Sequence, residues 1–404
     1  MSQRHPPLTD TVAAPRVGFD LNDLAQAAVD LVAERYPPPR SKRRDAGLHG
    51  HAEALSALSL SFTSARDELP PGYLDRPPIR AAYLLYYLVT GAATAQSVLR
   101  LSGVTPAFLP VGRPLRVLDL GAGPLSASLG LAALMGDRPM EVVAVDQSTR
   151  AMADGVRLFQ TLRPDVRVTT LRLDLRARGT ILKLEEGFDL VLAANVLNEL
   201  RPESRRGRGV DPIYQMVVGL LQRCLAPEGR LLHWEPGTRA AAGRLALLRD
   251  TLFAEQRAAI LGPCAGVAVC PLGHPAADGW CHAEQPWQRP PSVAALDEAI
   301  GHRRATLKFS WLALAPPAKA PLARPGWRII GGPMRDKGIL RRYICGAEGR
   351  VVATAFESEL AYSHPLRTAW RGEWLDELGP TTPMQGRRGE KVLKVGGHSR
   401  GERR

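Results

Sequence analysis

The sequence predicts an α/β protein whose main domain is a parallel, doubly wound sheet of the Rossmann-like type. From residue 115 onward, short apolar runs rich in β-branched residues alternate with helix-like segments at 124–135, 148–162 and 211–226. This alternation is typical of a parallel sheet with helices on both faces. The first run ends in glycines, as a nucleotide-binding sheet requires. The runs expected to form strands are Leu115–Gly121, Glu141–Asp146, Val166–Asp174, Phe188–Asn195 and Gly229–Glu235.

The region before this sheet, residues 20–104, is predicted to be helical. From Leu21, apolar residues recur at spacings of three and four, the pattern of an amphipathic helix. The run from Ile79 to Leu101 is apolar on most sides, so we expect it to be buried against the next domain. Residues 1–19 are polar and proline-containing, and they predict a disordered leader. No run of 18 apolar residues occurs, which argues against a membrane-spanning segment.

The charge of the chain points to a polyanionic partner. Among 404 residues, 53 are Lys or Arg and 40 are Asp or Glu, a formal net charge of +13. Basic proteins attract nucleic acid by neutralising phosphates and releasing counterions. A solvated basic surface with no partner is the alternative. The tail after Gly386 is also basic, and we expect it to be a flexible arm that orders on RNA.

A glycine loop follows the first predicted strand. Asp119, Gly121 and Gly123 form a D-x-G-x-G pattern between a strand and a helix, where glycines let the backbone turn tightly beside a ligand. Asp146 ends the second strand, where a carboxylate can accept both ribose hydroxyls of an adenosine ligand. A dinucleotide site would need a further glycine at Ser126. The pattern therefore favours S-adenosylmethionine (SAM) over a nicotinamide cofactor.

Further polar residues follow the third and fourth strands. Asp174 closes the third strand, where this fold often contacts adenine. Asn195 and Asn198 follow the fourth strand and are expected at the same rim of the sheet. Helix capping or loop hydrogen bonding is an equally good interpretation of the two asparagines.

Four cysteines suggest a metal site. Cys264, Cys270 and Cys281 lie in a segment rich in Gly, Pro and Trp, and Cys345 lies on a later predicted strand. Four thiolates suit either zinc or an iron–sulfur cluster, and the spacing selects neither. The C-x-x-x-C-x-x-C pattern of radical SAM chemistry does not occur. Cys224 lies in an apolar helical run and is interpreted as a core residue.

The organisation that we predict has five parts. They are a disordered leader (1–19), a helical region (20–104), a SAM-binding methyltransferase-like domain (105–260), a cysteine-rich insertion with the last sheet strands (261–360), and a basic, largely disordered tail (361–404). Two strand-like runs, Thr306–Ala315 and part of Arg341–Phe356, are expected to complete a seven-stranded sheet. The cysteine segment would then be an insertion before the sixth strand.

Several segments resemble the methyltransferase-like proteins of the small ribosomal subunit in bacteria and mitochondria. The similarity covers roughly residues 78–356, and the cysteine portion is its most specific part. The segments are Asp119–Pro124, Asn195–Leu200, Glu235–Gly237, Pro263–Cys264, Cys270–Leu272, Trp280–His282, Lys308–Ser310 and the stretch from Gly332 to Cys345.

The resemblance implies a class I SAM-dependent methyltransferase fold and association with the small ribosomal subunit and its 16S-type rRNA during assembly. It also implies a [4Fe–4S] cluster on Cys264, Cys270, Cys281 and Cys345, with zinc as the alternative, and a SAM loop at Asp119, Gly121 and Gly123. Where the family has a glycine after Gly-Pro, this chain has Leu125. We expect that side chain to crowd the amino-acid end of SAM and weaken its binding.

Three functions are weighed on these observations. The first is a small-subunit assembly factor, cytoplasmic or in the mitochondrial matrix, monomeric when free and without methyl transfer as its main role. The second is an active rRNA methyltransferase, but Asn195-Val-Leu-Asn lacks the prolines and aromatic residue of a base-methylating motif. The third is a small-molecule methyltransferase, which neither the charge nor the cysteines favour.

Overall fold

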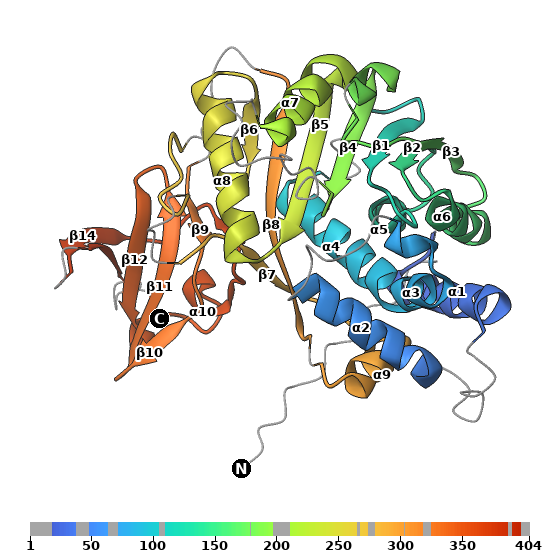
Figure 1. The fold of residues 1–404 in the computed structure, drawn as a ribbon. Coiled ribbons are helices and arrows are strands. Elements are labelled where there is room, and N and C mark those ends of the chain that lie inside the picture. Colours follow the sequence, from blue (N-terminus) through green and yellow to red (C-terminus); the bar gives the residue numbers. More distant parts are fainter. Residues whose placement is uncertain are drawn as a thin grey trace.

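The computed structural model describes residues 18–37, 48–63, 72–104, 110–177, 179–196, 211–264, 267–273, 279–302, 304–317, 325–386 and 390–396. Two sheets organise these residues (Figure 1). The first has eight strands and carries the glycine loop. The second has seven strands and lies toward the C-terminal end of the chain. Within the described residues, no helix is long and apolar enough to cross a membrane.

The first sheet has the strand order β3-β2-β1-β4-β5-β8-β6, with β7 paired to one end of β8. Pairing is parallel from β3 through β5, whereas β8 runs antiparallel to both β5 and β6. The strands are β1 (Leu115–Leu120), β2 (Met140–Asp146), β3 (Arg167–Arg172), β4 (Phe188–Ala194), β5 (Leu225–Pro236), β6 (Ala259–Gly262), β7 (Ala283–Pro286) and β8 (Thr306–Ala315). A reversed strand between the fifth strand and the edge is the arrangement of the class I methyltransferase fold, so the predicted fold class is confirmed.

Helices cover both faces of this sheet, so β1, β4 and β5 are buried on both sides. One face packs against α4, α5 and α6 in the largest apolar core, and the other packs against α7, η9 and α8. The helices following the strands are α5 (Ser126–Met135), α6 (Thr149–Leu162), η7 (Thr180–Lys183), α7 (Pro212–Gly219), the π-helical η9 (Leu220–Cys224) and α8 (Arg239–Ala254).

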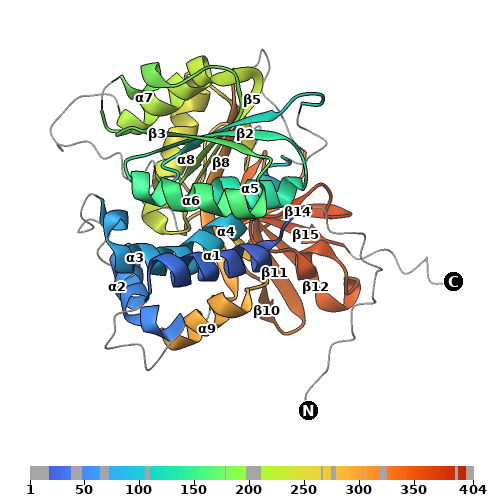
Figure 2. The ribbon, with the colours of Figure 1, turned by 90° about the vertical axis from the view of Figure 1, so that its right-hand side faces the viewer.

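The N-terminal region is helical, as predicted, and it packs beside α5 and α6 (Figure 2). Asp20 caps α1 by accepting hydrogen bonds from the backbone N–H groups of Asn22 and Asp23. Helix α4 crosses α5 so closely that a Cβ on Gly130 would lie 2.4 Å from the Ala92 carbonyl oxygen. The elements are α1 (Leu21–Arg35), η2 (Leu48–His51), α2 (Ala52–Thr63), η4 (Tyr73–Asp75), α3 (Pro77–Ala82), the π-helical η5 (Tyr83–Tyr87) and α4 (Leu88–Leu101).

The second sheet has the order β13-β9-β11-β12-β15-β14, with β10 paired to β11. One of its faces packs in a separate apolar core with Leu366 of α10. Its elements are β9 (Trp327–Ile329), β10 (Met334–Asp336), β11 (Ile339–Gly346), β12 (Gly349–Phe356), η10 (Glu357–Glu359), α10 (Pro365–Thr368), β13 (Trp374–Leu375), β14 (Thr381–Gln385) and β15 (Lys391–Val395). Helix α9 (Pro291–Ala299) precedes β8 and packs near α1 and η5.

The structure corrects three predictions about the C-terminal half of the chain. Thr306–Ala315 joins the main sheet as expected, but Arg341–Phe356 does not, because it folds into the β11–β12 hairpin with a core of its own. The edge strand β6 precedes the cysteine segment, so that segment follows the sixth strand. The described part of the predicted disordered tail contains α10 and β13–β15, and Lys391–Val395 pairs with both β12 and β14.

Candidate functional site

The glycine loop and the predicted acids lie at one edge of the first sheet, where the parallel strands β1 to β4 end. Gly121 and Gly123 have φ angles of 62° and 50°, a left-handed backbone that glycine adopts without strain. Asp146 at the end of β2 accepts hydrogen bonds from the backbone N–H groups of Gly123 (2.9 Å) and Ser148 (2.7 Å). Each carboxylate oxygen keeps a lone pair for a ligand hydroxyl. Burial raises the pKa of Asp146, and the two backbone N–H groups oppose that rise.

Asp119 lies beneath the loop, not on its surface. It is 1% exposed, and its Oδ2 accepts hydrogen bonds from the hydroxyl (2.6 Å) and backbone N–H (3.2 Å) of Ser128 at the start of α5. Burial raises the pKa of Asp119 to about 7. Its position therefore favours a role in fixing the β1–α5 turn.

The pKa of Asp119 makes stability depend on pH. Between its ordinary pKa of 3.8 and about 7, the folded chain keeps this carboxyl protonated while the unfolded chain loses the proton. Stability therefore falls as pH rises through that window, by on the order of 4 kcal/mol in total. We expect Asp119→Asn to exceed the wild type in urea-unfolding free energy at pH 8 and to match it near pH 4. Parallel pH curves for the two proteins would contradict this assignment.

Asp174 and Asn195 lie at the same edge of the sheet but make different contacts there. Asp174 is partly exposed and accepts hydrogen bonds from the Arg176 guanidinium at 2.9 Å, and Arg176 lowers its pKa. Arg176 also donates to the Gln147 side chain at 3.2 Å, which ties the third strand to the residue after Asp146. Asn195 has a φ of 56°, and its backbone N–H donates to the Trp234 carbonyl oxygen at 2.9 Å. Asn198 lies outside the described residues.

Leu125 does not lie where the sequence predicts. Its φ is 62°, which explains why glycine suits this position. Its side chain is fully buried, and its Cδ1 lies 2.6 Å from where a Cβ would stand on Gly155 of α6. The side chain thus packs into the core under α6 instead of crowding the loop. The residue that approaches the loop is Val196, whose Cγ2 lies 2.3 Å from the position of a Cβ on Gly121.

The four predicted cysteines gather where the cysteine segment meets the second sheet. Cys270, Cys281 and Cys345 share one small apolar cluster. Burial raises the pKa of the Cys270 thiol to about 12, and Cys281 and Cys264 raise it further. Burial also raises the pKa of Cys345, as do the other three thiols. All four sulfurs therefore lie within electrostatic range of one another. Cys224 is fully buried in the core, as predicted, where burial raises its pKa to about 11.

Polar groups of α8 and β9, which the sequence did not predict, make hydrogen bonds to this cysteine site. Arg328 is 2% exposed and donates from Nη1 to Cys281 Sγ at 3.1 Å. Burial lowers its pKa, but the thiols of Cys281, Cys264 and Cys345 outweigh burial and raise it. On α8, Arg249 donates to the Cys264 carbonyl oxygen (3.2 Å) and Asp250 accepts from the Cys270 N–H (3.0 Å). An arginine inside the apolar run Trp327–Ile330 was the signal available for Arg328.

The cysteine segment also contacts the end of β5, the strand beside β4 in the main sheet. The Trp280 ring N–H donates to the Gly237 carbonyl oxygen at 2.8 Å, just beyond β5. On β5 itself, buried His233 and Glu235 lie 3.0 Å apart (Nε2 to Oε1). The sequence reasoning missed this pair, although ionisable residues two apart on a buried strand must share one face.

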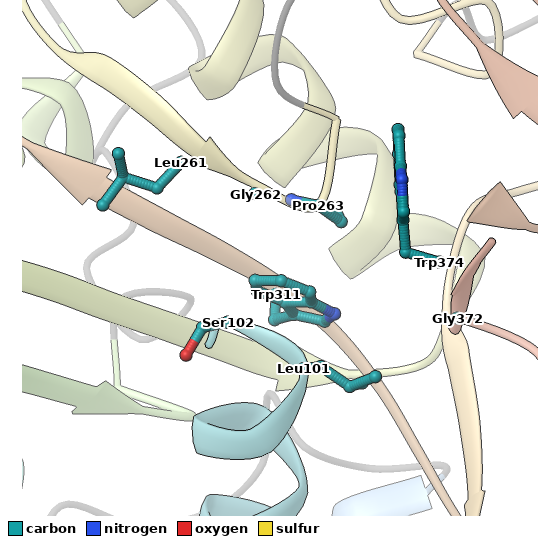
Figure 3. A pocket seen from close by; sticks show the side chains of 8 residues that line it. All are labelled: Leu101, Ser102, Leu261, Gly262, Pro263, Trp311, Gly372 and Trp374. Carbon is teal, nitrogen blue, oxygen red and sulfur yellow. The ribbon is translucent and has the colours of Figure 1, made fainter. Parts of the chain in front are cut away.

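A small cavity lies between the two sheets (Figure 3). Its volume is about 40 Å³, space for a few water molecules and not for an adenosine ligand. The indole N–H of Trp311 is buried and has no hydrogen-bond partner within the described part of the chain. The lining residues are Leu101, Ser102, Leu261, Gly262, Pro263, Trp311, Gly372 and Trp374.

The strand order, the glycine loop and the acid that ends β2 define a methyltransferase-like protein. Within that class, the family model described as mitochondrial small ribosomal subunit Rsm22 matches residues 80–378, about three-quarters of the chain. The chain therefore belongs to the Rsm22 family of the mitochondrial small ribosomal subunit. The match spans both the glycine loop and all four predicted cysteine ligands.

Solved structures with similar folds include several methyltransferases. The carbon methyltransferase of CurJ is 14% identical, with 73% of this chain and 71% of that chain covered and a TM-score of 0.38. A SAM-dependent methyltransferase from Leishmania major is 12% identical, with 67% and 84% covered and a TM-score of 0.35. No curated protein matches the sequence.

Proposed function

We propose that this chain is an assembly factor of the small ribosomal subunit that binds rRNA, holds SAM at the glycine loop and carries a [4Fe–4S] cluster. The family match over residues 80–378 is the observation that supports it most directly. The formal net charge of +13 suits an rRNA partner. The family is described as mitochondrial, which favours the mitochondrial matrix over the cytoplasm.

The described residues fit a SAM site formed by the chain's own loop. Gly121 and Gly123 present backbone without a Cβ, and Asp146 is held by two backbone hydrogen bonds with lone pairs to spare for ribose hydroxyls. In this proposal Asp174 and Asn195 border the adenine and the methyl-acceptor side. Bound SAM would supply a methyl group.

The thiols of the cysteine site and a neighbouring cation support the proposal of a cluster. Four sulfurs lie within electrostatic range, with buried Arg328 to offset thiolate charge. Yet among the described residues, no three His, Cys, Asp or Glu side chains are arranged to hold one metal ion. A tetrahedral zinc would need all its sulfurs about 2.3 Å from one centre. On the resemblance of this segment and the gathering of its thiols, we propose Cys264, Cys270, Cys281 and Cys345 as the cluster ligands, with zinc as the alternative.

Asp146 provides the direct test of the SAM site. Asp146→Ala removes the ribose acceptor and the acceptor of the Gly123 N–H, so we expect SAM affinity to fall at least about tenfold in calorimetry. Asp165→Ala is the matched control, because Asp165 precedes β3 at the opposite edge of the sheet and its carboxylate is engaged by Arg163, so its loss should leave SAM affinity unchanged. Equal affinities of wild type and Asp146→Ala would remove the pocket assignment.

Association with the small subunit is tested by co-sedimentation of the full chain with purified small subunits. We expect stoichiometric binding that weakens steeply with salt. The same particles, incubated with methyl-labelled SAM, should gain no label in their rRNA. Label that appears in rRNA only when the chain is present would establish the active methyltransferase instead.

A further inference from the structure

We propose that the exposed face of the second sheet binds single-stranded RNA, with a base stacked on Phe356 and phosphates contacted by Arg341, Arg350 and Lys394. This open face consists of the side chains on one side of β10, β11, β12, β15 and β14. The inference deepens the proposed function, since it assigns the RNA contact of the assembly factor to a particular surface.

The register of the strands places these residues on one face. Arg341 pairs with Thr354, Tyr343 with Val352, and Ile339 with Phe356, so their side chains share a side of the sheet. Thr354 pairs in turn with Lys394 of β15, and Lys394 pairs with Thr382 of β14. The opposite face, with Leu340, Ile344, Val351 and Ala353, is the one that packs in the core with α10.

The open face is accessible in the described structure. Phe356 on β12 is 44% exposed and Met384 on β14 is 52% exposed, and β15 lies between these two strands. Among the described residues, the end of the face near Cys345 is covered, because Tyr343 packs there with the cysteine cluster. Single exposed apolar residues need no explanation, but Phe356 is exposed beside Lys394 and shares its face with exposed Met334 and Met384, so this face offers apolar contact next to positive charge.

The chemistry of the face selects nucleic acid. Lys394 Nζ lies 5.8 Å from the Phe356 ring centroid, and the Arg350 guanidinium lies 4.1 Å from that of Tyr343. On the described strands, Asp336 is the one carboxylate that the register puts on this side, against three cations. Aromatic rings flanked by cations on an open sheet are how proteins bind unpaired bases, because every base has a face to stack and a phosphate beside it.

The test uses the full chain and fluorescence anisotropy with three labelled probes: a mixed-sequence single-stranded RNA, the matching duplex, and an abasic strand of the same length. We expect the single strand to bind best. Phe356→Ala should weaken it about tenfold or more, and Phe356→Trp should restore it, since either ring can stack. Arg341→Ala with Lys394→Ala should flatten the log–log salt slope by about 1.4.

Tyr362→Ala is the matched control, because Tyr362 is 92% exposed and lies under a cation, Arg367, but beside the helix that covers the other face. It should bind RNA like the wild type. The inference fails if Phe356→Ala binds like the wild type, or if duplex or abasic probes bind as well as the single strand. Co-sedimentation tests the proposed function separately. If the wild-type chain sediments with small subunits but the open-face variants bind RNA normally, the assembly role stands and the open-face proposal fails.

Discussion

Serine at any one of Cys264, Cys270, Cys281 or Cys345 is expected to abolish the visible absorption of the proposed iron–sulfur cluster in anaerobically purified protein. The four thiols influence one another's pKa in the structure, and we propose that they are the four ligands of one cluster. A hydroxyl is a far poorer ligand for iron than a thiolate, so a cluster that keeps three thiolate ligands is easily lost from the protein. Iron and sulfide analysis alongside the absorption spectrum measures the result.

Cys224→Ala is the matched control, because Cys224 is a fully buried thiol with a raised pKa that lies in another core. It should retain full iron content at a modest cost in stability. Colourless protein with one tightly held zinc would show that the four cysteines form a metal site but not a cluster. Unchanged absorption in all four serine variants would remove the cysteine assignment altogether.

The main sheet was predictable because its signals are local. Strands β1, β2 and β4 are apolar runs, and Asp119, Asp146 and Asn195 lie at or just after their ends. Since the carboxyl ends of parallel strands meet at one edge, their shared location follows from sequence order alone. The structure adds that Asp119 is buried beneath the loop, which depends on Ser128 one turn into α5.

The assignment of later strands was not predictable in the same way. Alternating apolar residues in 341–356 identify strands, but the pattern does not say which sheet they join. The edge strand β6 has four residues, too few to separate from the helix before it. The direction of the Leu125 side chain depends on Gly155, thirty residues later, whose missing side chain leaves room beneath α6.

Buried charges were the hardest features to anticipate, because their partners come from distant parts of the chain. Arg328 meets the thiol of Cys281 from another segment. Asp154 on α6 is fully buried, and its carboxylate accepts from the Tyr36 hydroxyl at 2.8 Å and pairs with Arg80 at 3.2 Å and Arg35 at 3.0 Å. In the sequence, Asp154 is one polar residue of an amphipathic helix and nothing marks it as internal.

Asp154→Leu is expected to lower the free energy of unfolding by about 3–5 kcal/mol, because it strips the counter-charge from Arg80, which is itself buried. This network joins α1 and α3 to α6, so the N-terminal helices should detach from the methyltransferase-like domain first. Arg157→Ala is the matched control: it breaks the exposed Arg157–Glu34 pair between the same α1 and α6, and should cost less than about 1 kcal/mol.

The double variant Asp154→Leu with Arg80→Met distinguishes the unpaired charge from lost packing. Replacing both partners by apolar side chains removes the buried, unpaired guanidinium of Arg80. We therefore expect the double variant to recover much of the stability that Asp154→Leu alone loses. Urea unfolding followed by circular dichroism measures all four proteins. If Asp154→Leu costs no more than Arg157→Ala, the buried network does not hold the helical region to the sheet domain, and the attachment must come from the apolar contacts of α4 with α5.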